Sequence, residues 1–263
     1  MSATPAAARA AVSIVDVTLP VTGQDHPVRA WLVSADHDDA EHGRPRSAVL
    51  WLHWLGHKHN DRSEFLPLAV ELASRGAVSL LPAGHFPWVP DPDGTATDIQ
   101  RIRDQVDAHA VALDHLAAQP GVDPTRIAVV GHDYGGMYAA LLADRDDRIS
   151  TVALQAVDAA WDSWFASFWL ELEDEPRRAY AARFAELQPV DAVARLADRL
   201  GDRMLMQWAG KDSFVTAATR AAYERAGPKA RSRFYDNADH MLNDAAAADL
   251  TEFLAEHLGL DQN

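Results

Sequence analysis

The chain has 263 residues, of which 48% are hydrophobic and 24% charged, a composition typical of an ordinary globular domain with a substantial core. Its 39 acidic and 24 basic residues give a formal charge of -15, which argues against binding to nucleic-acid phosphates or anionic lipid and favours a small-molecule substrate. The sequence contains no cysteine, which excludes disulfides, thiolate nucleophiles and cysteine-ligated metals.

From the apolar runs of the sequence we expect no signal peptide at the N-terminus and no membrane-spanning segment. The segment MSATPAAARAAVSIVDV has no apolar run of signal-peptide length, and no stretch approaches the roughly 20 apolar residues that span a bilayer. We therefore expect a cytoplasmic protein without membrane attachment. We expect no cofactor, and the oligomeric state is open, with a homodimer as one option.

The pattern of apolar residues predicts alternating strands and helices after an N-terminal hairpin. Period-two alternation predicts half-buried strands, continuous apolar runs predict strands buried on both faces, and helical spacing with Gly or Pro stops predicts helices. The expected order is strands at 12–19 and 27–35, a polar loop at 36–46, a strand at 48–54, a helix at 63–75, a strand at 77–83, a loop at 84–95, a helix at 97–118, a strand at 126–133, a helix at 135–143 and a strand at 149–156.

The alternation breaks once and then resumes. Residues 159–200 have no strand pattern and many aromatic side chains, so we predict a small helical, cap-like insertion within a single domain of residues 1–263. The expected elements after it are a strand at 203–210, a helix at 216–225, a strand at 231–237 and a helix at 242–258. Strands joined by helices predict right-handed crossovers, and hence an α/β fold with an eight-stranded, mostly parallel sheet covered by helices on both faces.

A tight turn is predicted where the strand at 126–133 meets the following helix, in the sequence Gly131-His132-Asp133-Tyr134-Gly135-Gly136. Small residues two places either side of Asp133 allow so sharp a bend that the apex side chain is pushed out above the sheet edge. The motif resembles the nucleophile elbow of the α/β-hydrolase superfamily, with Asp133 where most members have serine.

The later polar residues also occur in the order typical of this superfamily, in which nucleophile, acid and base follow successive strands. The resemblance implies Asp133 as nucleophile, Asp212 in AGKDSFV as acid and His240 in DNADHM as base. Asp158, after the strand at 149–156, is an alternative acid, because some relatives with an aspartate nucleophile place theirs there. Asp212 is the preferred assignment.

The sequence His53-Trp54-Leu55-Gly56 matches the loop that contributes oxyanion-hole amides in this superfamily. The expected donors are the N–H groups of Trp54 or Leu55 and of Tyr134. The aromatic residues of the insertion have two interpretations: plain packing of the insertion onto the body, or the lining of an apolar substrate pocket over Asp133. Its predicted lining is His53, His132, Trp161, Trp164, Phe165, Trp169 and Tyr180.

One further motif is similar to a metal site. His57-Lys58-His59-Asn60-Asp61 resembles part of the HxHxDH motif of metallo-β-lactamase-like proteins, but Arg62 stands where the final histidine is required. A solvated loop with a helix N-cap is the simpler interpretation. We therefore predict no metal.

An aspartate at the elbow changes the expected reaction. An ionised carboxylate, with a pKa of about 3.9 in model peptides, needs no base before it attacks, but attack on an ester carbonyl gives an anhydride and must expel an alkoxide. Attack on a saturated carbon bearing a halide or an epoxide oxygen gives a stable ester, which water activated by His240 can hydrolyse. Superfamily members with an aspartate nucleophile, the epoxide hydrolases and the haloalkane and fluoroacetate dehalogenases, use this chemistry.

The resemblance to those enzymes is incomplete. They usually have His-Gly-x-Pro in the oxyanion loop and a larger cap, whereas HWLG and the small insertion look more like the dienelactone-hydrolase-like branch. The main hypothesis is hydrolysis of an epoxide or carbon–halogen bond in an apolar small molecule. The alternatives are a lyase or isomerase that uses Asp133 or His240 as general base, and a catalytically silent hydrolase-fold protein that binds a ligand.

Overall fold

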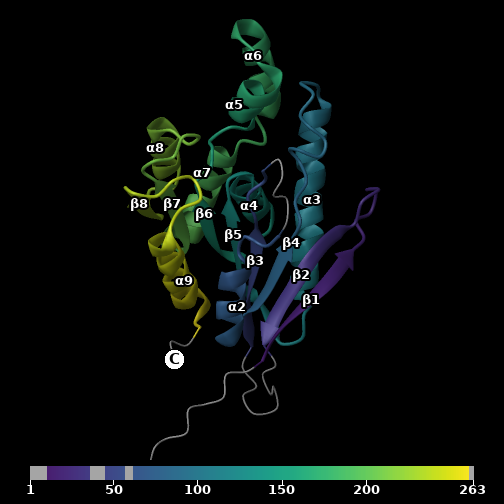
Figure 1. The fold of residues 1–263 in the computed structure, drawn as a ribbon, viewed down its shortest axis with the longest axis vertical. Coiled ribbons are helices and arrows are strands. Elements are labelled where there is room, and N and C mark those ends of the chain that lie inside the picture. Colours follow the sequence, from purple (N-terminus) through teal and green to yellow (C-terminus); the bar gives the residue numbers. More distant parts are fainter. Residues whose placement is uncertain (1–10, 36–44, 57–61, 261–263) are drawn as a thin grey trace, which may run out of the picture.

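Eight strands form one sheet in the order β1-β2-β4-β3-β5-β6-β7-β8 (Figure 1). The computed structural model describes residues 11–35, 45–56 and 62–260. The pairs β1–β2 and β2–β4 are antiparallel and all other neighbouring strands are parallel. The strands are β1 Val12–Leu19, β2 Val28–Ala35, β3 Arg46–Leu52, β4 Val78–Pro82, β5 Val122–His132, β6 Ile149–Gln155, β7 Met204–Ala209 and β8 Arg231–Tyr235. The predicted eight-stranded, mostly parallel sheet is confirmed.

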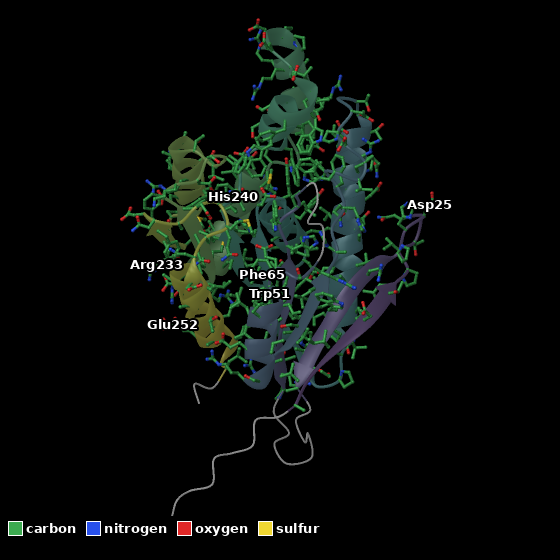
Figure 2. The ribbon with its side chains drawn as sticks, viewed as in Figure 1. Asp25, Trp51, Phe65, Arg233, His240 and Glu252 are labelled. Carbon is green, nitrogen blue, oxygen red and sulfur yellow. The ribbon has the colours of Figure 1, made fainter. Side chains whose placement is uncertain are left out.

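The two faces of the sheet carry separate apolar cores because successive side chains of a strand point to opposite sides. Alternate residues of β3, such as Leu50 and Trp51, enter different cores. Helices α2 (Leu66–Ser74) and α9 (Asp244–Leu258) cover the Trp51 side, where Trp51 and Phe65 pack with ring centroids 5.1 Å apart (Figure 2). The opposite face is covered by α3 (Thr97–Ala117), α4 (Tyr134–Arg145) and α7 (Pro189–Leu200).

The chain between β6 and α7 leaves the body of the molecule. It forms α5 (Trp161–Phe165), a π-helical turn (Ala166–Leu170), α6 (Asp174–Ala181) and a 3₁₀ turn (Ala182–Phe184), and Figure 1 shows α5 and α6 projecting beyond the sheet. The predicted insertion at 159–200 extends too far, because α7 packs against α4 and α8 (Ala217–Ala226) as an ordinary crossover helix. The buried residues of α7 follow helical spacing and pack in the core that α3 and α4 also cover. They are Ala192, Val193, Leu196 and Leu200.

Element boundaries differ from the predictions by a few residues. Strand β5 begins at Val122 rather than at 126, because Val122 pairs with Arg46 at the start of β3. Helix α2 begins at Leu66 rather than at 63, after a turn. Helix α9 begins at Asp244 because the Asn243 side chain accepts the Ala246 N–H at 3.1 Å as an N-cap.

Two features of the sequence lie wholly or largely outside the described residues. These are the polar loop predicted at 36–46, of which 36–44 are not described, and the motif at 57–61. Within the described part of the chain, no helix is both long and apolar enough to cross a membrane.

Candidate active site

Asp133 occupies the apex of the sharp turn between β5 and α4. Its backbone has φ 57° and ψ -127°, a conformation that costs free energy for any residue with a Cβ. The flanking glycines are required by close packing, since a Cβ on Gly135 would lie 2.1 Å from the Leu52 carbonyl oxygen and one on Gly131 would lie 2.3 Å from the Gly135 carbonyl oxygen. The elbow geometry expected from the sequence is present.

The structure brings Asp133, His240 and Asp212 together from three separate loops. His240 Nε2 lies 3.3 Å from Asp133 Oδ1, and His240 Nδ1 lies 2.9 Å from Asp212 Oδ2. The imidazole is mostly buried, below the helices of the insertion (Figure 2). Burial disfavours the imidazolium, but hydrogen bonds to Asp133 and Asp212, together with their charges, raise the pKa of His240 to about 9.

Asp212 is held by its own loop, which begins where β7 ends. Its Oδ1 accepts the N–H groups of Phe214 at 2.8 Å and Val215 at 3.0 Å, while its Oδ2 contacts the imidazole. Burial favours the neutral acid, but the hydrogen bonds from His240 and the backbone outweigh it and lower the pKa of the carboxyl. Asp212 is thereby fixed as an anion oriented toward His240.

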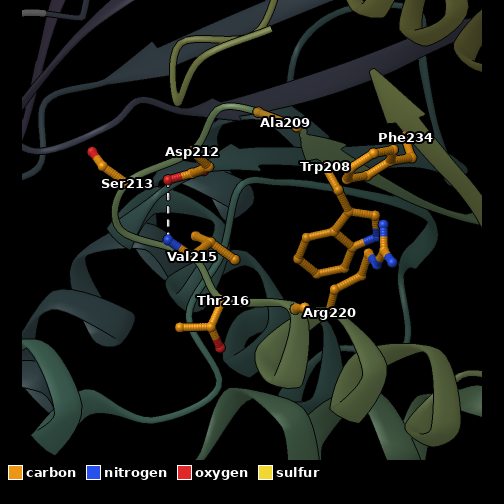
Figure 3. A pocket seen from close by; sticks show the side chains of 10 residues that line it. Trp208, Ala209, Asp212, Ser213, Val215, Thr216, Arg220 and Phe234 are labelled. Atoms are coloured by element: carbon orange, nitrogen blue, oxygen red, sulfur yellow. Dashed lines mark hydrogen bonds between the residues drawn. The ribbon is translucent and has the colours of Figure 1, made fainter. Parts of the chain in front are cut away.

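The same loop forms one wall of a cavity of about 320 Å³ at the β7–β8 end of the sheet (Figure 3). The cavity is lined by Trp208, Ala209, Gly210, Asp212, Ser213, Val215, Thr216, Ala217, Arg220 and Phe234. The Arg220 guanidinium lies 4.4 Å from the centroid of the Phe234 ring. Asp133 and His240 do not line this cavity, so it is distinct from the space over the nucleophile position.

The alternative acid Asp158 does not contact the imidazole. Its carboxylate accepts the Ala159 N–H at 2.7 Å, the Thr219 hydroxyl at 3.2 Å and the Ser163 hydroxyl. Burial raises the pKa of Asp158 to about 6. Its local role is to tie the end of β6 to α5 and α8, and the hydrogen bonding leaves Asp212 as the partner of His240.

Of the predicted oxyanion-loop donors, the structure directs Leu55 to Asp133. The Leu55 N–H donates to Asp133 Oδ2 at 3.3 Å. The Trp54 N–H donates instead to Glu64 Oε2 at 2.7 Å, so the alternative assignment of Trp54 is corrected. Tyr134 is the first residue of α4, where a backbone N–H has no acceptor within the helix.

The two histidines predicted to line the pocket are buried structural groups. His53 Nδ1 lies 2.6 Å from the Trp54 carbonyl oxygen, and His53 Nε2 accepts the Gly84 N–H at 2.9 Å. His132 contacts Glu64 and the His240 carbonyl oxygen. Placing them in the pocket was wrong because both rings are turned into the protein, where backbone groups and a carboxylate bind their nitrogens.

The aromatic residues of the insertion divide into packing residues and one active-site neighbour. Trp161 and Phe165 are fully buried, and the Trp161 indole donates to the Leu187 carbonyl at 2.8 Å. The Tyr180 hydroxyl donates to buried Asp98 at 2.7 Å, and the Trp169 indole donates to Asp91 at 3.1 Å. Packing and internal hydrogen bonds account for Trp161, Phe165 and Tyr180, which are buried. Trp169 is partly exposed, so its pocket role stays a prediction.

Trp164 is the predicted pocket residue that the structure places beside the imidazole. Its ring centroid lies 6.3 Å from that of His240 and 4.9 Å from that of Tyr134, edge to face in both pairs. Neither the Trp164 indole N–H nor the Tyr134 hydroxyl has a hydrogen-bond partner among the residues that the structure describes, and neither atom is fully enclosed. The Trp164 ring beside His240 and the Tyr134 ring beside Trp164 therefore each carry a donor without a partner among the described residues.

Two contacts of the site had no recognisable pattern in the sequence. Glu64 links the oxyanion loop to His132, and Phe214 packs its ring 5.0 Å from His240 and 5.9 Å from Phe168 of the insertion. A glutamate or phenylalanine in a loop is common, so only the fold identifies these neighbours. Among the described residues, no group of histidine and acidic side chains could hold a metal ion, and the motif at 57–61 lies outside them.

Comparison with known families agrees with this geometry. The model of the prolyl oligopeptidase family matches residues 99–261, which include the elbow, Asp212 and His240. The chain belongs to the prolyl oligopeptidase family. With the fold described above, this membership makes it a hydrolase of the α/β-hydrolase type. No curated protein matches the sequence significantly.

Solved structures of other proteins of this fold superpose on most of the chain. A Klebsiella pneumoniae protein described as a dienelactone hydrolase has a TM-score of 0.66 at 15% identity, covering 95% of this chain and 100% of its own. An acetyl xylan esterase from Paenibacillus sp. R4 has a TM-score of 0.73 at 18% identity, covering 97% and 87%. Oligopeptidase B from Leishmania major has a TM-score of 0.70 at 13% identity, and this chain covers 37% of it. At these identities the likeness establishes the fold.

Proposed function

We propose that the chain hydrolyses an epoxide or a carbon–halogen bond in an apolar small molecule through an ester formed on Asp133. The observation that carries this proposal is the carboxylate at the elbow apex, 3.3 Å from His240 Nε2, with His240 Nδ1 2.9 Å from Asp212. The unpaired donors of Trp164 and Tyr134 beside an aromatic wall support an apolar substrate with one polar leaving group.

In the first half-reaction, Asp133 Oδ1 forms a bond to the electrophilic carbon. The carbon–halogen or carbon–oxygen bond breaks, and its electron pair leaves with the halide or the epoxide oxygen. The Trp164 N–H and the Tyr134 hydroxyl are the candidate donors to that leaving atom. Burial raises the pKa of Tyr134 well above its ordinary value, so the hydroxyl stays protonated and able to donate.

In the second half-reaction, water attacks the Asp133 carboxyl carbon and releases the alcohol. The oxygen in contact with the Leu55 N–H is Oδ2 of Asp133 itself, so this donor is positioned to stabilise the oxyanion that forms on the ester carbonyl. Esterification removes the negative charge of Asp133, which lowers the pKa of His240 and frees the imidazole to take a proton from water. Net turnover consumes one water, which gives a diol from an epoxide, or an alcohol, a proton and a halide ion.

Peptide or ester cleavage through Asp133 is chemically less favourable. A carboxylate that attacks an acyl carbon forms an anhydride, which is higher in energy than the ester or amide it replaces. The serine-type reaction of acyl transfer also requires a hydroxyl at the apex from which histidine removes a proton. Asp133 supplies no such proton.

Turnover in heavy-oxygen water tests the ester intermediate. One oxygen of water enters the Asp133 carboxylate in each cycle, so we expect the peptide that contains Asp133 to gain label over many turnovers, measured by mass spectrometry. In a His240→Gln variant the ester should accumulate and add the mass of the substrate's alkyl group to that peptide. An unlabelled peptide after repeated turnover by the unsubstituted enzyme would contradict the mechanism.

The same experiment separates the other candidates. Turnover without label and without an adduct in His240→Gln indicates that Asp133 or His240 acts as a general base in a lyase or isomerase. No turnover on a panel of epoxides, haloalkanes and esters, with ligand binding that survives Asp133→Ala, indicates a ligand-binding protein.

A further inference from the structure

Glu64 and His132 connect three parts of the active site that are far apart in the sequence. Glu64 Oε2 accepts the Trp54 N–H of the oxyanion loop at 2.7 Å, and Glu64 Oε1 lies 2.5 Å from His132 Nδ1 of the elbow. His132 Nε2 lies 2.9 Å from the carbonyl oxygen of His240. Both side chains are shielded from solvent, with 1% of the His132 side chain and 15% of the Glu64 side chain exposed.

The structure assigns Glu64 and His132 to a positioning pair that holds the oxyanion loop and the His240 loop in register with the elbow. The assignment rests on the site of the proposed function, but not on the identity of the reaction. One of the three contacts joins Glu64 to His132. The other two join the pair to the backbone of Trp54 and to the backbone of His240. Loss of either side chain therefore releases a loop rather than a reacting group.

The hydrogen-bond geometry dictates where the protons of the pair are. A carbonyl oxygen only accepts, so His132 Nε2 carries a hydrogen and donates it to the His240 carbonyl. The 2.5 Å contact between His132 Nδ1 and Glu64 Oε1 also needs one proton, because two lone pairs would otherwise face each other. Whichever atom holds that proton, the pair has no net charge.

Neutrality matters because the two imidazoles are neighbours. The ring centroids of His132 and His240 lie 5.1 Å apart. A net positive charge at His132 would oppose protonation of His240, and a net negative charge would favour it. The pair therefore fixes the position of the His240 main chain without adding a charge beside the imidazole.

Glu64 also determines which amide of the oxyanion loop faces Asp133. By accepting the Trp54 N–H, it turns that group away from the elbow and leaves the Leu55 N–H directed at Asp133 Oδ2, 3.3 Å away. Without the Glu64 carboxylate, the half-buried Trp54 N–H loses its 2.7 Å acceptor. We expect the loop to shift and the Leu55 contact to loosen.

Nuclear magnetic resonance of the full chain tests the pair without any substrate. Wild-type protein should show a strongly downfield proton attached to a His132 ring nitrogen, together with a through-bond coupling between His132 Nε2 and the His240 carbonyl. Glu64→Ala should abolish the downfield signal, move the Leu55 and Trp54 amide resonances, and lower the pKa of His240 by about one pH unit as its contacts with Asp133 and Asp212 loosen.

Glu64→Gln is the matched conservative variant. Its amide oxygen can accept the Trp54 N–H and its amide nitrogen can donate to His132 Nδ1, so the Leu55 resonance and the pKa of His240 should stay near wild type. Glu71→Ala, at an exposed glutamate of α2 whose carboxylate lies 4.0 Å from Arg75, controls for removal of a carboxylate elsewhere. It should leave the His240 and Leu55 signals unchanged.

A folded Glu64→Ala protein with wild-type His240 titration and Leu55 shift would overturn the assignment. If that variant does not fold, absence of the His132–His240 coupling in the wild-type protein overturns it. These readouts are independent of the ester mechanism, since an unlabelled Asp133 in heavy-oxygen water would leave them unaffected.

Discussion

At the scale of single residues, Asp133 is a carboxylate held in a strained backbone conformation with two defined partners. Its φ of 57° persists because β3, β5 and α4 pack tightly around the turn. The Leu55 N–H and the His240 imidazole each contact one of its oxygens. The nucleophile position is therefore pre-organised, and its charge controls the protonation of His240.

Asp133→Asn should lower the pKa of His240, which is about 9 in the unsubstituted protein. Loss of one of two flanking carboxylates should reduce it by about 1–3 pH units, measured by the pH dependence of the imidazole resonances. Asp158→Asn is the control, because the Asp158 carboxylate is bound by Ala159, Ser163 and Thr219 and not by the imidazole. Equal titration of His240 in both variants would contradict the electrostatic link to Asp133.

Trp164→Phe removes an unpaired indole N–H and keeps an aromatic ring beside His240. We expect ester formation to slow by about 100-fold, the effect of losing one donor to a developing negative charge. The rate can be measured as alkylation of Asp133 in a His240→Gln background. Trp169→Phe is the matched control, since the Trp169 indole already donates to Asp91. Equal rates in the two variants would exclude Trp164 as a leaving-group donor.

At the scale of elements, the elbow depends on the close approach of β3, β5 and α4. Gly135, in the first turn of α4, faces the carbonyl oxygens of Leu52 and His53, which lie 2.1 and 2.4 Å from where its Cβ would be. Both contacts are with backbone, which cannot rotate away as a side chain can. The helix thus lies directly against the end of β3, and this places Asp133 next to Leu55.

Gly135→Ala should therefore destabilise the protein through steric overlap. We expect a loss of about 3 kcal/mol in the free energy of unfolding, measured by urea denaturation. Gly201→Ala provides the comparison, because no atom lies within 4 Å of the point that a Cβ on Gly201 would occupy. Only its backbone conformation, with φ 57° and ψ -121°, costs free energy, about 2 kcal/mol. A smaller loss for Gly135→Ala than for Gly201→Ala would contradict the packing of the elbow.

At the scale of the whole molecule, the charge network of the site couples to the stability of the fold. The unfolded chain binds a proton at His240 with the ordinary pKa of 6.5, whereas the folded protein binds it with a pKa of about 9. The folded state therefore holds more protons than the unfolded state between these values. The stabilisation from His240 is complete below pH 6.5 and is lost as pH rises through 9.

The free energy of unfolding should fall by about 3 kcal/mol between pH 6.5 and pH 9, from the difference in pKa of His240. Urea denaturation across this range measures the loss, and His240→Gln should flatten the dependence. The carboxyl groups with shifted pKa titrate below this window. Burial lowers the pKa of His109 to about 3 and also lowers the pKa of His85 and His257. These three histidines therefore bind protons near pH 6.5 only in the unfolded chain, and they offset part of the loss at the acid end of the window. Unchanged pH dependence in His240→Gln would show that another group is responsible.

The sequence alone was sufficient for the sheet, the helices over it and the order of the elbow, Asp212 and His240, because these depend on local periodicity, glycine spacing and the ends of successive strands. The observed element boundaries differ from the predicted ones where strand pairing or helix capping sets them, as at Val122 and Asn243. The prediction of the insertion ran into α7 because an amphipathic helix has the same pattern whether it packs on a sheet or projects from it.

Only the tertiary structure decided which polar groups face Asp133. Periodicity shows that a side chain is polar or apolar, but not whether a buried nitrogen meets a backbone carbonyl or open space. His53 and Tyr180 therefore looked like pocket residues until their hydrogen bonds were known. Glu64 had no distinguishing pattern, because its partners at Trp54 and His132 come together only when β3 and β5 pair in the sheet.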